Sequence, residues 1–175
     1  KLAKFNANQA IENRIGKSDK YDHAMQNLSH YLGLQKTNLL IEGYDVSHHA
    51  GKYAVASAVK FSNSGPDKNA YKLYNIDPFY AGNDVGSIEH VLRRRAKKAS
   101  QYPLPDIILI DGGKAQLNAA LRIFNSIDST HPIILSIVKG VKRVRATETI
   151  LSEQGILEIP LNSPGFILLQ QIRDE

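Results

Sequence analysis

The chain has 175 residues, which suits one domain with at most a small appendage. It is 42% hydrophobic and 22% charged, as expected for a globular domain. The net charge of +5 fits a polyanionic partner, and the absence of cysteine excludes disulfides, thiolate zinc sites and a cysteine nucleophile. No apolar run approaches the roughly 18 residues needed to span a bilayer, and the first residues lack a secretory signal, so we expect a soluble, cytoplasmic protein with no membrane partner.

The first 38 residues are expected to be a helical segment that leads in from upstream domains. A patchy apolar stripe favours a first helix, and Ser18 with Asp19 is expected to cap a second helix that runs to Leu32. The main domain is predicted over residues 39–175.

Three antiparallel strands are predicted at the start of the main domain. Residues 39–46 and 53–61 are apolar runs, and residues 71–76 alternate as a strand does. Turn-forming residues at 63–67 leave only tight connections between the runs, which implies a meander.

The rest of the chain alternates between helices and strands. The predicted elements are a helix over 84–100, a strand over 107–111, a helix after Gly112-Gly113, a strand over 133–138, a hairpin around Gly155 and a helix from Pro164 through Ile172. The strand over 107–111 has four apolar residues in succession, which suits a central parallel strand covered on both faces. The predicted fold class is α/β, with a mixed five-stranded sheet (three antiparallel strands, then two parallel) flanked by helices.

Two of the central strands end in an aspartate, Asp45 and Asp111. If these strands are neighbours, both carboxylates emerge at the same edge of the sheet, and a divalent cation would relieve their repulsion. Oxygen ligands suit Mg²⁺ or Mn²⁺, which can activate water and stabilise charge at a phosphodiester. The alternative is a turn or helix-capping aspartate, because Asp111 precedes a predicted helix.

Other polar residues have both a functional and an ordinary explanation. Asp84 is either a third acidic group or the cap of its helix, and Lys114 either contacts a phosphate or lies in a plain strand-to-helix turn. Asp77 and Asp106, each next to a proline, are expected to be turn residues. Basic residues that contact phosphates, or simply form a solvated face, are Arg93, Arg94, Arg95, Lys97, Lys98, Lys139, Lys142, Arg143 and Arg145. His48 and His49 could bind a ligand, or they could only pack at the surface.

Several of these stretches resemble one known family. Residues 41–48 are similar to the I-E-x-F/Y-D-I/V-S-H stretch of the excision nuclease UvrC, and residues 107–117 to its I-L-I-D-G-G-K-G-Q-L stretch. Residues 84–95 resemble the segment between these motifs, and residues 163–175 resemble the ending D-S-P-A to L-L-Q-x-I-R-D-E. The resemblance runs in the same order along the whole chain.

The resemblance implies a ribonuclease H-like domain that cuts damaged double-stranded DNA on the 5′ side of a lesion, together with UvrB bound through a segment outside this chain. It implies that Asp45 and Asp111 are catalytic, metal-binding carboxylates that hold Mg²⁺ or Mn²⁺. It also implies that Asp84 is a third catalytic acid, acting directly or indirectly. From their charge and position, the residues that we expect to contact DNA are Lys114, Arg93, Arg94, Arg95 and His48.

Three departures from the family pattern qualify this expectation. Asn83 replaces a second acid that often stands beside Asp84, and Ala115 replaces a glycine. The family's catalytic histidine lies two positions beyond Glu175, so we expect residues 1–175 alone to bind metal weakly and cut poorly. The rival hypotheses are a catalytically inactive nucleic-acid- or protein-binding module with the same fold, and a Rossmann-like nucleotide binder, which the missing glycine fingerprint disfavours.

Overall fold

The computed structural model describes residues 2–49, 53–80, 82–127, 131–140 and 148–175. The helices and strands are α1 (Leu2–Tyr31), β1 (Ile41–His49), β2 (Tyr53–Ser62), β3 (Gly65–Pro66), η1 (Lys68–Ala70), β4 (Lys72–Asn75), η2 (Pro78–Tyr80), α2 (Asp84–Ala96), β5 (Ile107–Asp111), α3 (Lys114–Phe124), β6 (Ile133–Val138), β7 (Thr149–Ser152), β8 (Gly155–Ile156) and α4 (Pro164–Asp174).

One mixed sheet organises the described residues. Its strand order is β3-β2-β1-β5-β6-β7-β8, and β4 pairs with β2 beside β3. Strands β1, β2 and β4 are antiparallel, and β5 and β6 run parallel to β1. The predicted core of three antiparallel and two parallel strands is therefore confirmed. The short strands β3, β7 and β8 extend it, and β7 with β8 forms the hairpin expected around Gly155.

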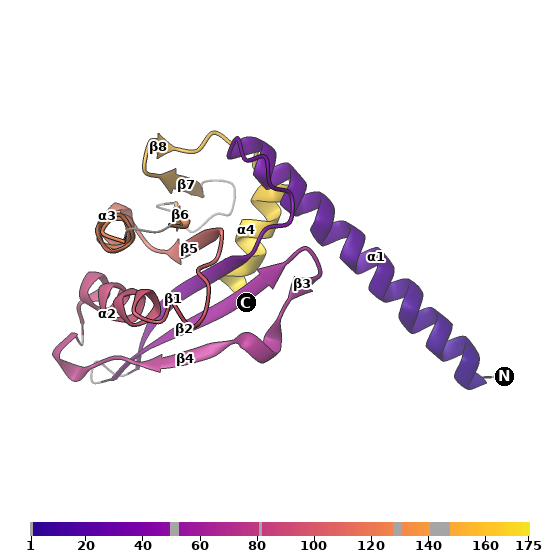
Figure 1. Ribbon diagram of the computed structural model, residues 1–175, viewed down its shortest axis with the longest axis horizontal. Helices are drawn as coiled ribbons and strands as arrows, with labels where there is room; N and C mark the ends of the chain where they lie inside the picture. Colours follow the sequence, from indigo (N-terminus) through magenta and orange to yellow (C-terminus); the bar gives the residue numbers. More distant parts are fainter. Residues whose placement is uncertain (1, 50–52, 81, 128–130, 141–147) are drawn as a thin grey trace.

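Helices cover both faces of the sheet, with α1 and α4 on one side and α2 and α3 on the other (Figure 1). The central strand β5 supplies both cores, because its side chains alternate between the faces. Ile107 and Leu109 pack in the cluster with α1 and α4, while Ile108 and Ile110 pack in the cluster with α2 and α3. This explains why the strand is apolar at four successive positions.

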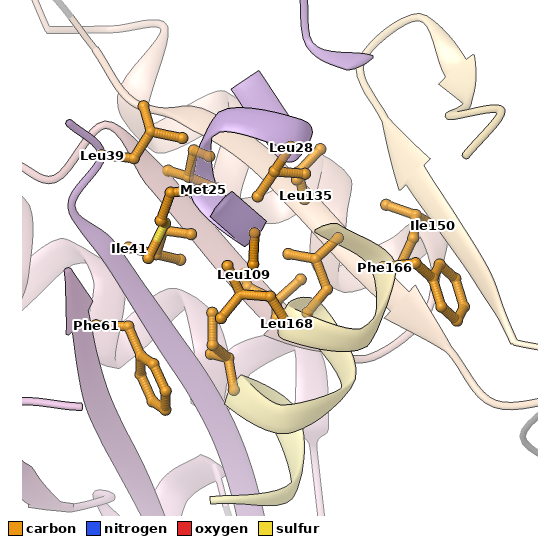
Figure 2. Packing of buried hydrophobic residues seen from close by; sticks show 14 of the residues in the cluster. Met25, Leu28, Leu39, Ile41, Phe61, Leu109, Leu135, Ile150, Phe166 and Leu168 are labelled. Atoms are coloured by element: carbon orange, nitrogen blue, oxygen red, sulfur yellow. The ribbon is translucent and has the colours of Figure 1, made fainter. Parts of the chain in front are cut away.

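Helix α4 packs across the sheet through a dense apolar contact. Phe166 and Leu168 of α4 lie with Leu109 of β5 and Met25 of α1 in one buried cluster (Figure 2). Ser163 caps the helix by accepting a hydrogen bond from the Phe166 amide at 3.3 Å. This packing carries the last turn of α4 to the ends of β1 and β5.

The N-terminal region is one helix, so the prediction of two helices was wrong. Ser18 and Asp19 lie inside α1, which continues to Tyr31 and is followed by Gly33 at a φ of 65°. No proline interrupts this stretch, and Met25 and Leu28 are fully buried, so tertiary packing outweighs the local capping signal. Among the described residues no helix, α1 included, combines the length and apolar character needed to cross a membrane.

Candidate metal centre

Strands β1 and β5 bring Asp45 and Asp111 together. The parallel register pairs Ile41 with Ile107 and continues to Tyr44 with Ile110, so the next positions along the two strands are the two aspartates. Both aspartates line one small pocket with the end of α4, which contributes Ile172, Arg173 and Glu175. The expectation that the two carboxylates meet at one edge of the sheet is met by this geometry.

A glycine in β1 allows α4 to approach the two carboxylates. A Cβ atom on Gly43 would lie 2.6 Å from Ile172 Cγ2 and 3.0 Å from Val59 Cγ2, so any larger residue would push α4 away. Sequence reasoning did not single out Gly43. The signal was present, because a glycine inside a strand often marks a close backbone approach.

The electrostatics of the site indicate a need for positive charge. Burial raises the pKa of Asp45 above its ordinary value, and the negative charge of Asp111 raises that pKa further. Asp84 adds a smaller contribution in the same direction, while Lys139 acts in the opposite direction. Burial and the charge of Asp111 therefore both disfavour the ionised form of Asp45, as expected of a carboxylate suited to bind a cation.

One protein cation already lies at the site. Lys139 Nζ is 2.8 Å from Asp111 Oδ2, with the lysine side chain 53% exposed and the aspartate side chain 15% exposed. Lys139 follows β6, which is parallel to β5, so the end of β6 places it beside the end of β5. Its proximity to Asp111 could have been deduced from the predicted parallel order.

Asp84 does not cap its helix. Asn83 is the N-cap of α2, and its side chain accepts a hydrogen bond from the Gly86 amide at 2.9 Å. Asp84 is exposed in the first turn, close enough to Asp45 to affect its pKa. The capping alternative is therefore wrong, and a role for Asp84 at the site stays a prediction.

The turn after β5 is fixed from two directions. Ser136 of β6 donates a hydrogen bond to the Gly112 carbonyl, and the Gly113 amide donates to Gln116 Oε1 at 2.7 Å. Lys114 is the first residue of α3 and is exposed at the same edge as Asp111. This position suits contact with a phosphate, which stays a prediction.

The basic cluster of α2 divides into two groups. Arg93 and Arg94 are exposed, Arg93 paired with Glu89 and Arg94 lying over the Tyr74 ring at 5.3 Å. Arg95 is only 6% exposed.

Arg95 is bound inside the protein. Its guanidinium binds Glu42 at 3.0 Å and donates to the carbonyls of Tyr102 and Pro103, while Tyr44 donates to the same glutamate at 2.7 Å. We therefore no longer propose that Arg95 contacts a phosphate, because its N–H donors already bind partners inside the protein.

Some predicted residues cannot be placed. The side chains of His48 and His49 lie outside the described residues, although the β1 backbone includes both positions. Lys142, Arg143 and Arg145 also lie outside them. Lys97 and Lys98 are exposed near the end of α2.

A divalent cation fits the donors at this edge only in part. Asp45 and Asp111 supply carboxylate oxygens, the ligand type that Mg²⁺ and Mn²⁺ prefer, and their mutual repulsion favours a cation between them. Within the described residues, no group of three or more histidine, cysteine or acidic side chains is arranged to hold a metal. The two carboxylates would therefore supply two ligands to a cation, which would need further ones.

The mixed sheet with helices on both faces has the ribonuclease H-like architecture, and comparison with known proteins supports this class. Residues 29–175 match the family described as UvrC RNAse H endonuclease domain. The chain belongs to the UvrC family.

Individual relatives agree with the family match. The UvrABC system protein C of Hahella chejuensis is 40% identical over 99% of this chain, and that of Pseudomonas syringae pv. syringae is 36% identical over 99%. The chain spans 29% of the length of either relative. Among solved structures, endonuclease V of Ciona intestinalis in complex with DNA is 13% identical, with a TM-score of 0.46 over 77% of this chain and 59% of that chain.

Proposed function

We propose that this domain hydrolyses a DNA phosphodiester with the help of Mg²⁺ or Mn²⁺. The observation that carries the proposal is the meeting of Asp45 and Asp111 at the edge of a central sheet, where burial and the charge of Asp111 raise the pKa of Asp45. Membership of the UvrC family supports the same chemistry. A bound divalent cation would supply charge stabilisation at the phosphodiester and a nucleophile at neutral pH.

The residues of the chain have separate tasks in this proposal. Asp45 and Asp111 hold the cation, and Asp84 adds negative charge at the same edge without being a required ligand. Exposed Lys114, Arg93 and Arg94 contact the phosphates of the strand. Contacts of this kind position DNA without reading its sequence, which suits an enzyme that must act at lesions in any context.

In this proposal, the segment after α4 supplies a further ligand in the full-length protein. Glu175 lines the pocket of the two carboxylates and is held by Lys68 Nζ at 2.9 Å. The family's histidine follows this position by two residues, so the geometry supports a ligand that enters from the end of α4.

The wider biological role is part of the same proposal. The relatives are named UvrABC system protein C, and the resemblance to the UvrC family leads us to propose cytoplasmic excision repair, with incision on the 5′ side of a lesion and UvrB as a partner. We propose residues 39–175 as the nuclease domain and residues 1–38 as the segment that connects it to the rest of the protein.

Manganese binding and DNA nicking test the proposal in the full-length protein that contains this chain. Calorimetry should detect an Mn²⁺ site that is lost in Asp45→Asn. A duplex with one lesion, labelled on the damaged strand, should be cut on the 5′ side by the wild type and not by the variant. Equal Mn²⁺ binding and equal 5′ nicking by both proteins would contradict the proposal.

A catalytically inactive binding module is the second candidate, and the ion pair between Lys139 and Asp111 favours it. A lysine that permanently neutralised Asp111 would leave the site without need of a metal. This candidate predicts DNA binding in EDTA with no Mn²⁺ site that depends on Asp45. The calorimetric comparison therefore separates the two functions.

A further inference from the structure

The ion pair between Lys139 and Asp111 differs from the buried ion pairs of the domain. The side chains of Arg95 and Arg173 are 7% and 5% exposed, and each binds a glutamate that is nearly as buried. Lys139 is 53% exposed, and a lysine stem is flexible. Lys139 can therefore leave its carboxylate at small cost, whereas the two arginines cannot.

We propose that Lys139 is an exchangeable counter-ion that holds Asp111 when no metal is bound and moves to a DNA phosphate when a cation takes its place. This inference rests on the proposed nuclease function. It assigns Lys139 a contact with a non-bridging oxygen of the phosphodiester to be cut, which makes it a further catalytic residue.

The charges at the site favour such an exchange. When both carboxylates are ionised, Asp45 and Asp111 carry two negative charges, of which the ion pair with Lys139 neutralises one. A divalent cation neutralises both, so the lysine loses its electrostatic reason to remain. A phosphodiester that enters the site brings one negative charge, which an ammonium within reach can bind as a point charge.

The opposite end of β5 offers a matched control. Lys36 Nζ lies 2.7 Å from Asp106 Oδ1, with side chains 58% and 24% exposed, so the pair has nearly the same geometry and exposure. Asp106 precedes the strand, whereas Asp111 ends it. Lys36→Met thus removes an equivalent ion pair far from the proposed metal site.

The test measures Mn²⁺ binding and DNA nicking by the full-length protein. The proteins compared are the wild type, Lys139→Met, Lys139→Arg and Lys36→Met. The Asp45→Asn variant shows which part of the Mn²⁺ binding belongs to the proposed site. Because Lys139 competes with the metal, Lys139→Met should bind Mn²⁺ about two- to fivefold more tightly, as expected from loss of a half-exposed ion pair. It should nevertheless nick DNA about 100-fold more slowly, because a charge that stabilises the phosphate is gone. Lys139→Arg should recover part of the nicking, and Lys36→Met should keep wild-type Mn²⁺ affinity.

Each other outcome overturns a defined part of the inference. Weaker Mn²⁺ binding by Lys139→Met, in step with slower nicking, would show that the lysine only supports the position of Asp111. Tighter Mn²⁺ binding by Lys139→Met with an unchanged nicking rate would show that Lys139 does not contact the phosphate. Absence of an Asp45-dependent Mn²⁺ site in the wild type would instead reject the proposed function, and that result is distinguishable because it does not involve Lys139.

Discussion

Strand β5 has an aspartate at each end, and each aspartate forms an ion pair with a lysine. Before the strand, Asp106 accepts hydrogen bonds from Lys36 Nζ at 2.7 Å and from the Leu40 amide at 2.8 Å. At its end, Asp111 binds Lys139 at 2.8 Å but shares its surroundings with the carboxylate of Asp45. The two ion pairs have nearly the same length, and they differ in what surrounds the aspartate.

The difference separates a structural carboxylate from a candidate ligand. The carboxylate of Asp106 accepts hydrogen bonds from Lys36 and from the Leu40 amide, and these bonds tie the start of β5 to the residues before β1. Asp111 instead faces a like charge, and the cation that the described residues place beside it is a half-exposed lysine. A carboxylate that the protein leaves in this position is suited to a cation from outside.

The largest expected effect is on DNA cleavage, where the two ends should respond very differently to the same change. Asp111→Asn should slow nicking by the full-length protein about 1000-fold, because loss of a ligand removes several kcal/mol of charge stabilisation. Asp106→Asn should stay within a few-fold of wild type. The measurement is the nicking rate of each variant on one damaged duplex at saturating Mn²⁺. Similar losses in Asp111→Asn and Asp106→Asn would contradict a special role for Asp111.

The second effect is on stability and concerns cations with internal or external partners. Arg95→Met should lower the free energy of unfolding by about 3–5 kcal/mol, because it leaves the buried charge of Glu42 unpaired. Arg93→Met removes an exposed pair with Glu89 and should cost less than about 1 kcal/mol. Urea unfolding monitored by circular dichroism checks this contrast. An equal cost for both arginines would mean that the buried network is not what holds α2 to β1.

A smaller effect is expected on DNA affinity. Lys114→Met should weaken binding of undamaged duplex a few-fold in EDTA and reduce the slope of log K against log salt by about 1, as expected for loss of one phosphate contact. Lys36→Met, at the other end of the sheet, should leave the slope unchanged. Fluorescence anisotropy at several salt concentrations measures both slopes. If the salt dependence of binding were unchanged in Lys114→Met, Lys114 would not contact a DNA phosphate.

The sheet was predictable because its signals are local. The apolar run that precedes Asp111 requires cover on both faces, and this property predicted β5 as a central parallel strand. The structure then places it beside β1. Once the two strands are neighbours, the meeting of Asp45 and Asp111 follows from their equivalent positions at the strand ends. The metal hypothesis therefore needed only strand order.

Features that depend on side-chain packing were not predictable in the same way. Arg93, Arg94 and Arg95 are equivalent as a basic run in the sequence, but the helical period turns only Arg95 toward Glu42. The continuous helix α1 escaped prediction for a related reason, since Met25 is buried by contacts with distant segments that no local pattern reveals. Burial, rather than residue type, decided both cases.

The smallest expected effect has opposite signs at Asp45 and Asp106. Because the pKa of Asp45 is raised in the folded protein, its ionised form opposes folding, and this cost is present at neutral pH and disappears as the pH falls through the raised pKa. Asp45→Asn should therefore increase the urea midpoint of the metal-free protein at pH 8, with a difference that shrinks toward the ordinary aspartate pKa of about 3.9.

Asp106→Asn should lower that midpoint, since it weakens the bonds from Lys36 and the Leu40 amide. Adding Mn²⁺ should then stabilise the wild type and not Asp45→Asn, because only a protein that binds the ion gains stability from it. A metal-free Asp45→Asn protein less stable than wild type would mean that Asp45, like Asp106, is held by the fold and not strained by its neighbours. That result would remove the physical reason for a cation at this edge of the sheet.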